Sequence, residues 1–165
     1  MLRGLLVGLP DSWTGTPDVG GGWRPRDVVG HLITGDQTDW MRRTHQILEE
    51  GAARPFERFE RFAMLERDAG VGLDELVERF ATLRAANLVE LRGLATDADL
   101  DRRGRHPSLG EVTLRELLAS WAVHDLDHIG QIFAGLAGSH DADVGPWKVY
   151  LGILLRREDP SAIPG

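Results

Sequence analysis

Apolar residues along this chain recur at intervals of three and four positions, the spacing that puts side chains on one face of an α-helix. The pattern holds over residues 2–9, 25–50, 73–94 and 111–136, and more briefly over 146–155. Prolines stop the first stretch and open the second and the last. No run alternates apolar and polar residues as a half-buried strand does. The sequence therefore predicts an all-α protein.

The connections between these helices are long. Residues 10–24 are rich in glycine and proline, residues 52–71 carry one or two helical turns at most, and residues 95–111 are predicted as a loop. Four substantial helices joined by two long connections favour a bundle with a crossover over simple up-and-down hairpins. At 165 residues, with no internal repeat, the chain fits one domain, residues 1–165. We expect a four-helix bundle followed by a short C-terminal helix.

Composition narrows the range of partners. The formal net charge is −7, and an acidic surface repels phosphate backbones, so we expect no nucleic-acid partner. No stretch approaches the ~20 apolar residues of a membrane-spanning helix, and the N-terminal apolar run is too short for a signal peptide. The absence of cysteine removes thiolate ligands, a cysteine nucleophile and disulfides. We expect a cytoplasmic protein.

Two histidines in the helix predicted over 111–136 carry the strongest chemical signal. His124 and His128 are one helical turn apart, in the middle of a face otherwise made of leucine, isoleucine and tryptophan. Imidazoles at this spacing can converge on one metal ion. The alternative is a pair of core histidines, each hydrogen-bonded to a partner. Two on one apolar face favour metal ligation, which needs a third ligand from elsewhere.

The remaining histidines differ in how well they suit that role. His106 and His140 fall in predicted loops. His31 and His45 share the helix over 25–50, but fourteen residues separate them, about 21 Å along the axis, so they cannot bind the same ion. Apolar residues surround His31, whereas His45 follows two arginines and is expected to face solvent. The residues alone favour His31 only slightly.

Three segments of the chain resemble the DinB-like superfamily: WRPRDVVGHL at 23–32, GEVTLRELLASWAVHDLDHIGQI at 110–132 and GPWKVYLGIL at 145–154. That superfamily includes bacillithiol transferase-like proteins and, more distantly, mycothiol-dependent maleylpyruvate isomerases. The resemblance covers nearly the whole chain. It implies a four-helix bundle of up-down-down-up order that binds a divalent metal through one histidine on the second helix and two on the later one.

The metal ligands that the resemblance implies in this chain are His31, His124 and His128, and Gln131 matches the glutamine that follows the last of them. The chain departs from the superfamily at its start. The first helix is long in that superfamily, whereas here it is cut short at Met1. Either the natural start lies upstream or the first helix is abbreviated. The first helix would form one wall of the pocket around the implied metal site, so this wall is the part of the site that the resemblance leaves open.

The resemblance also implies a homodimer. Surplus apolar residues on the helix over 25–50 support this expectation, because a bundle this small would not bury them all internally and an exposed apolar patch usually marks an interface. These residues are Trp40, Met41, Ile47 and Leu48.

Other catalytic motifs are weaker. The segment from His124 to His128, HDLDH, resembles the H-E-x-x-H of zinc proteases, but aspartate is one methylene shorter than the glutamate base of that motif. No downstream glutamate or histidine helix suits a protease of that kind. No G-x-S-x-G elbow supports a serine hydrolase, and no phosphate-binding or dinucleotide fingerprint occurs.

Three neutral imidazoles leave a tetrahedral ion with one open position, which is typical of a catalytic site and not of a structural one. Zinc or nickel is the expected metal, with iron or manganese as alternatives, because imidazole suits several divalent ions. Asp125, Asp127 and Gln131 are candidates to orient the imidazoles or to contact a small-molecule substrate. For the two aspartates, solvation on the helix surface is an equal alternative.

The reaction itself stays open at this stage. The resemblance implies thiol-dependent transfer or isomerisation, and since the chain has no cysteine the thiol would be a low-molecular-weight cosubstrate. Metal-assisted hydrolysis is the nearest enzymatic alternative. The third hypothesis is a non-enzymatic, metal-stabilised bundle that acts in binding or stress response.

Overall fold

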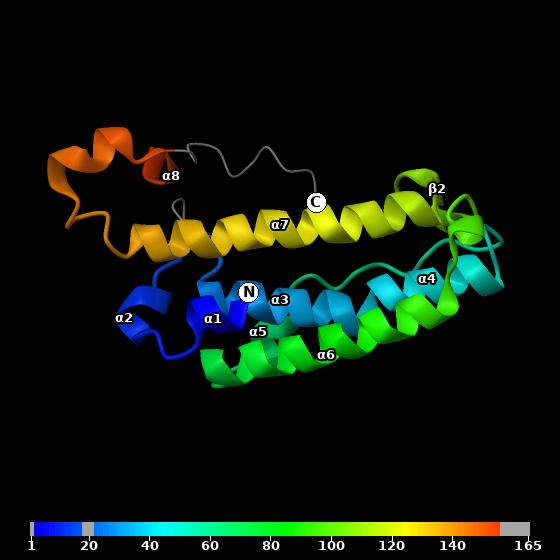
Figure 1. Cartoon of the computed structure of the whole chain (residues 1–165), viewed down its shortest axis with the longest axis horizontal. Helices are drawn as coiled ribbons and strands as arrows, with labels where there is room; N and C mark the ends of the chain where they lie inside the picture. The colour runs from blue at the N-terminus through cyan, green and yellow to red at the C-terminus, as the bar shows by residue number, and fades with distance from the viewer. Residues whose placement is uncertain (1, 18–21, 156–165) are drawn as a thin grey trace.

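The computed structural model describes residues 2–17 and 22–155, and Figure 1 shows them arranged as a helical bundle. Helix α7 runs along one side, α3 continued by α4 lies in the middle, and α6 forms the other side next to the short α1. The bounds are α1 Leu2–Leu6, α3 Pro25–Thr38, α4 Trp40–Glu49, α6 Leu73–Leu94 and α7 Leu114–Gly138. In Figure 1, α3 and α6 run in one direction while α1 and α7 run in the other, which is the up-down-down-up order expected.

A long crossover joins α4, the continuation of α3, to α6, which runs parallel to α3. After α4 the chain returns along the bundle and forms α5 (Ala63–Arg67), which packs on α3, before α6 begins. Arg67 at the end of α5 ties this crossover to α3, because its guanidinium donates to the Gly30 carbonyl and to the Thr34 hydroxyl, each at 2.9 Å. The crossover is therefore held against the helix that carries His31.

The helix predicted over 25–50 is present but broken. Pro25 occupies its first turn, where no N–H is needed. At Asp39 the backbone leaves helical geometry, with φ −122° and ψ −74°, and this divides α3 from α4. Beyond the break the Trp40 indole lies across Gly35, where a Cβ would come within 2.8 Å of the indole Nε1. The apolar spacing continues through both halves, so the sequence carried no sign of the break.

Helix α7 begins at Leu114, three residues after the predicted start at 111. The Thr113 hydroxyl accepts a hydrogen bond from the Glu116 amide at 3.2 Å, and the Glu116 carboxylate accepts one from the Thr113 amide at 2.7 Å. This reciprocal pair is a capping box, which satisfies amides that have no partner within the helix. The helix continues to Gly138, slightly past the predicted end at 136.

A short β-hairpin occupies the end of the predicted loop over 95–111 and the first residues of the helix predicted over 111–136, where no strand was expected. A 3₁₀ turn, η1 (Asp97–Asp99), precedes β1 (Arg103–His106), which pairs in antiparallel fashion with β2 (Gly110–Thr113). Gly110 adopts φ +81°, a conformation that glycine allows without a steric penalty. Strands of four residues are too short for their alternation to stand out in the sequence.

Both ends of the described chain differ in detail from the prediction. Helix α1 stops at Leu6 instead of residue 9, before Gly8 takes φ +80°, and a single turn, α2 (Asp11–Thr14), forms within the predicted loop. Near the other end, the predicted helix over 146–155 is a 3₁₀ segment, η2 (Gly145–Tyr150), followed by the short α8 (Gly152–Leu155).

The buried apolar residues form two clusters. One joins α1, α3, α6 and the later half of α7, where Ile132 is fully buried. The other joins α4, the segment around Phe56 and the first half of α7, which contributes residues up to Trp121. His124 and His128 lie on α7 between Trp121 and Ile132, so the histidines occupy the junction of the two clusters.

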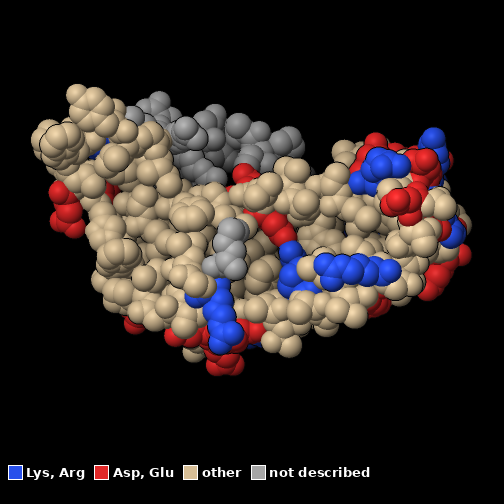
Figure 2. All heavy atoms as spheres, in the orientation of Figure 1, with Lys and Arg blue, Asp and Glu red and all other residues tan. Residues whose placement is uncertain are grey.

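The helices and the charged surface can be compared with what the composition predicts. Within the described residues, none of the helices has both the length and the apolar character that a membrane crossing requires. Figure 2 shows Lys and Arg interspersed with Asp and Glu on the face displayed, most densely at the end formed by α4 and the hairpin.

Candidate metal centre

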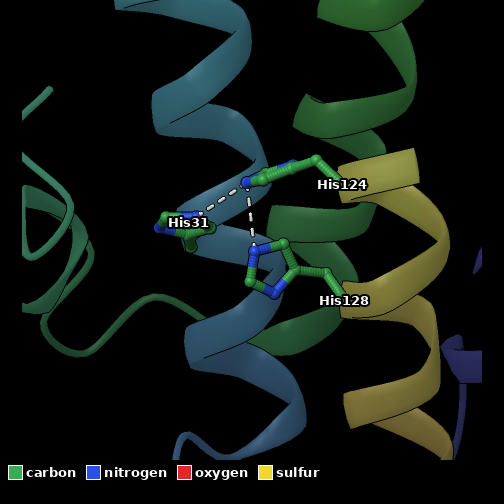
Figure 3. Close-up of side chains that lie close together, drawn as sticks. All are labelled: His31, His124 and His128. Carbon is green, nitrogen blue, oxygen red and sulfur yellow. Dashed lines mark hydrogen bonds between the residues drawn. The ribbon is translucent and has the colours of Figure 1, made fainter. Parts of the chain in front are cut away.

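Three histidines from two helices meet at one point between α3 and α7. Figure 3 shows His31 on α3 facing His124 and His128 on α7. The Nε2 atom of His124 lies 3.1 Å from the Nε2 of His31 and 3.1 Å from the Nε2 of His128. One nitrogen from each of the three residues lies within 4.8 Å of the others. For a tetrahedral zinc with Zn–N of about 2.0–2.1 Å, neighbouring ligand nitrogens are roughly 3.3 Å apart, so the spacing suits one ion.

The outer nitrogens of two imidazoles face hydrogen-bond acceptors. The Nδ1 of His31 is 3.2 Å from the backbone carbonyl of Arg61, and the Nδ1 of His128 is 2.7 Å from the Gln131 side-chain oxygen. An acceptor at Nδ1 holds the proton on that atom, which leaves the Nε2 lone pair of a neutral imidazole free. Two unprotonated Nε2 atoms therefore point at a common position, and a cation there would satisfy both.

His124 differs from the other two. Its Nδ1 is buried and has no hydrogen-bond partner among the described residues. Asp125 Oδ1 lies 3.7 Å from this atom, which is too long for a direct hydrogen bond. The side chain of His124 is also 23% exposed, whereas His31 and His128 are buried. The cluster is therefore least enclosed at His124.

Burial keeps the two enclosed imidazoles neutral. Loss of hydration, reinforced by the repulsion that a protonated His128 would exert, lowers the pKa of His31 to about 3. Burial, reinforced by His124, likewise lowers the pKa of His128 to about 4. Both side chains are thus uncharged at neutral pH, the form that a metal ligand requires.

Aromatic rings enclose the histidines on both sides. The Trp23 ring lies 4.7 Å from the ring of His31 and stacks on His128 at 6.1 Å, and Phe59 meets His31 edge-on at 5.3 Å. On the other side, Trp40 meets His124 at 5.1 Å. Such a shell lowers the local dielectric, which strengthens the attraction between an ion and any anionic group bound to it.

The other candidates from the sequence are placed as follows. Gln131 contacts His128, and Asp125 lies beside His124 with its carboxylate paired to Arg84. Asp127 is exposed. Because Asp125 faces Arg84, HDLDH does not present a free base in the manner of a zinc protease.

The histidines outside the centre lie elsewhere on the molecule. His45 is partly exposed and hydrogen-bonds to Glu90 on α6 at 2.6 Å, in agreement with the expected solvent-facing position. The His106 ring lies 6.4 Å from the Phe56 ring, and His140 lies against Trp13. Neither belongs to the cluster formed by the other three.

Sequence reasoning missed Arg84 and the crossover residues beside His31. Arg84 lies four residues after Phe80 and seven before Leu91, on the inward side of α6. A charged residue on an apolar stripe was the available signal, and it indicates a buried ion pair. The Arg61 carbonyl had no signal, because a backbone acceptor is available at any residue.

The fold and the site together define a small helical-bundle protein with a three-histidine cluster suited to one divalent ion. A family model of the DinB superfamily matches residues 1–132. The chain belongs to the DinB superfamily, as its resemblance to that group indicated.

A solved structure is similar to this protein over most of both chains. YfiT from Bacillus subtilis shares 25% sequence identity with this chain at a TM-score of 0.69, and the match covers 81% of this chain and 77% of YfiT. YfiT is described as a probable metal-dependent hydrolase with an unusual four-helix bundle topology. No curated protein matches this chain at a significant level.

Proposed function

We propose that the chain is a metal-dependent enzyme that holds one divalent ion, zinc or nickel in preference to iron or manganese, through His31, His124 and His128. The observation that carries this proposal is the convergence of three Nε2 atoms from two helices. Three protein ligands leave a fourth position for water or substrate, and the partial exposure of His124 gives access to it.

The preferred reaction is transfer or isomerisation that depends on a low-molecular-weight thiol. A divalent ion in this centre would deprotonate a coordinated thiol, or lower the pKa of a coordinated water toward 7. Hydrolysis also calls for a base to handle the protons of water, and the Asp125 carboxylate beside the centre is engaged by Arg84. A thiol loses its proton on coordination, so this arrangement favours a thiol as the nucleophile.

Hydrolysis is the second candidate, and one observation favours it. The similar structure YfiT is described as a probable metal-dependent hydrolase. A hydrolytic reaction would place water at the open position, with Gln131 and Asp125 orienting the imidazoles around it. A bundle that binds metal without turnover remains the third candidate, and the assays below separate it from both enzymes.

Metal binding is tested by stoichiometry. Protein stripped with a chelator and titrated with Zn²⁺ should bind one ion per chain, as measured by elemental analysis after dialysis. Alanine in place of any proposed ligand should weaken binding by a large factor, about 100-fold or more, because each supplies a third of the protein donor set. The matched controls are His45→Ala, His106→Ala and His140→Ala, which should leave one ion per chain. Full occupancy in His124→Ala would contradict the site.

Turnover separates the reactions. The zinc-loaded protein is assayed with a small thiol and a halogenated aromatic electrophile, where an S–C bond forms as halide leaves, and separately with ester and amide substrates. Thiol consumption that His124→Ala loses and His45→Ala keeps would support transfer. Hydrolysis without any thiol effect would replace transfer by the second candidate, and the absence of turnover in both assays would favour the non-enzymatic one.

We further propose that the chain forms a homodimer. The residues that first suggested this do not supply the surface, because they are packed within the chain. Trp40, Met41 and Ile47 are buried, and Leu48 is partly buried against the same apolar cluster. Support comes instead from α7, whose outward side exposes Val123 by 63% and Leu126 by 65%. Light scattering at micromolar concentration should give twice the mass of the 18.2 kDa chain, and a mass of one chain would contradict the dimer.

A further inference from the structure

A buried ion cluster links the metal centre to the three long helices. Arg84 on α6 donates from Nε and Nη2 to the two carboxylate oxygens of Asp36 on α3, each at 2.7 Å. The same guanidinium donates from Nη1 and Nη2 to Asp125 on α7, the second bond at 3.2 Å. We propose that Arg84 is a positioning residue of the metal centre, which fixes the Asp125 carboxylate behind His124. This proposal rests on the proposed metal site.

His124 is the proposed ligand whose Nδ1 lacks a hydrogen-bond acceptor. The Nδ1 atoms of His31 and His128 already face acceptors, whereas the Nδ1 of His124 is buried without one. A ligating imidazole usually donates its other N–H to a carboxylate or carbonyl, which sets the tautomer and the ring orientation. Asp125 Oδ1, at 3.7 Å, is close enough to become that acceptor after a small rotation of either side chain.

Helix geometry alone does not place the Asp125 carboxylate beside the His124 imidazole. Adjacent residues on a helix point about 100° apart, so neighbouring side chains do not normally face each other. The carboxylate is held beside His124 because Arg84 donates to both of its oxygens, from Nη1 to Oδ2 and from Nη2 to Oδ1, the oxygen nearer His124. Arg84 thus acts on the ligand through Asp125 and makes no contact with the proposed ion position.

Arg84 is itself rigidly placed. Its guanidinium carbon lies 4.8 Å from the Phe80 ring and 4.8 Å from the Trp121 ring. Asp36, the anchor on α3, is fully buried at its side chain, and Asn87 donates to its backbone carbonyl at 2.9 Å. A planar fork that binds two carboxylates and contacts two rings is specific to arginine, since lysine offers a single point charge.

Charge alone predicts the opposite effect on metal binding. A guanidinium near a divalent cation repels it, so removal of the Arg84 charge should tighten binding if only Coulomb forces matter. Substitution by lysine keeps the charge and should then change nothing. A positioning role predicts weaker binding for both substitutions, because the carboxylate behind His124 is no longer held. The direction of the change therefore distinguishes the two explanations.

The experiment measures Zn²⁺ affinity by competition and the visible absorption of the Co²⁺-loaded protein. The variants are Arg84→Lys, Arg84→Met, Asp125→Asn and the double variant Arg84→Lys/Asp125→Asn. Asp125→Asn leaves the pair of Arg84 with Asp36 intact, so it preserves the anchor in the bundle. The matched control is Arg79→Lys, because Arg79 lies on the same helix and pairs with the buried Asp68 at 3.2 Å.

We expect Arg84→Lys and Asp125→Asn each to weaken Zn²⁺ binding by about 10–100-fold and to shift the Co²⁺ bands, as loss of an outer hydrogen-bond partner does in other metal sites. The double variant should be no weaker than the single ones, because both substitutions interrupt one chain of contacts. Arg79→Lys should match the native protein.

Native affinity and native Co²⁺ bands in Arg84→Lys, or tighter binding in Arg84→Met, would overturn the positioning role while leaving the metal site intact. A native protein that binds no ion, or a His124→Ala variant that keeps it, would overturn the proposed function and this role with it. The two failures are therefore distinct in one set of measurements.

Discussion

Acid should destabilise the metal-free protein through two buried imidazoles. Burial, with a smaller contribution from neighbouring histidines, lowers the pKa of His31 to about 3 and that of His128 to about 4. In the unfolded chain a histidine has a pKa of about 6.5. Between these values the unfolded chain binds more protons than the folded one. The free energy of unfolding must therefore fall as the pH falls from about 6.5 toward 4.

The size of the effect follows from these pKa values. At about pH 5 an unfolded histidine is almost fully protonated, while His31 and His128 stay neutral in the folded protein. Relative to about pH 7.5, each contributes a loss of about 2 kcal/mol, or roughly 4 kcal/mol for the pair. Small domains have a total stability of about 5–15 kcal/mol, so the loss is easily measured.

The assay is urea unfolding of chelator-treated protein at about pH 7.5 and pH 5, for the native chain and for His128→Asn. The variant should lose about 2 kcal/mol less than the native protein between the two pH values, because it lacks one of the two groups. The control is His45→Asn, at a partly exposed position, which leaves both buried imidazoles in place. Equal losses in the native chain and His128→Asn would refute the inference that burial keeps this imidazole neutral.

Further substitutions test the packing around the site. Gly104→Ala should destabilise the protein by about 1–3 kcal/mol in urea unfolding, because a Cβ there would lie within 2.6 Å of neighbouring core side chains. Gly130→Ala on α7 meets no atom within 4 Å and should stabilise the protein by about 0.5–1 kcal/mol in the same assay. Thr113→Ala removes the cap of α7 and should cost about 1 kcal/mol, also seen as a lower melting temperature. Gln131→Met removes the acceptor at His128 Nδ1 and should weaken Zn²⁺ binding by about 10–100-fold in a competition titration.

Local patterns determined the long helices and two of the three histidines of the site. The three-and-four spacing of apolar residues placed α6 and α7 nearly at their observed bounds, and it covered α3 and α4 as one helix. The same spacing put His124 and His128 on one face, since residues four apart on a helix always adjoin. These features depend only on contacts within one helix, which is why the sequence alone could predict them.

Contacts between segments decided the rest. The break at Asp39 leaves no mark on the apolar spacing, which continues through α3 and α4. The hairpin before α7 is formed by pairing of two strands of only four residues each. The histidine that joins His124 and His128 depends on how α3 lies against α7, and the sequence by itself favoured His31 over His45 only slightly until family resemblance was added. Arg84 belongs to the centre only because α6 brings it between two carboxylates from other helices. Periodicity reports which side of a helix is buried, whereas the identity of the neighbour across the interface is a property of the folded bundle.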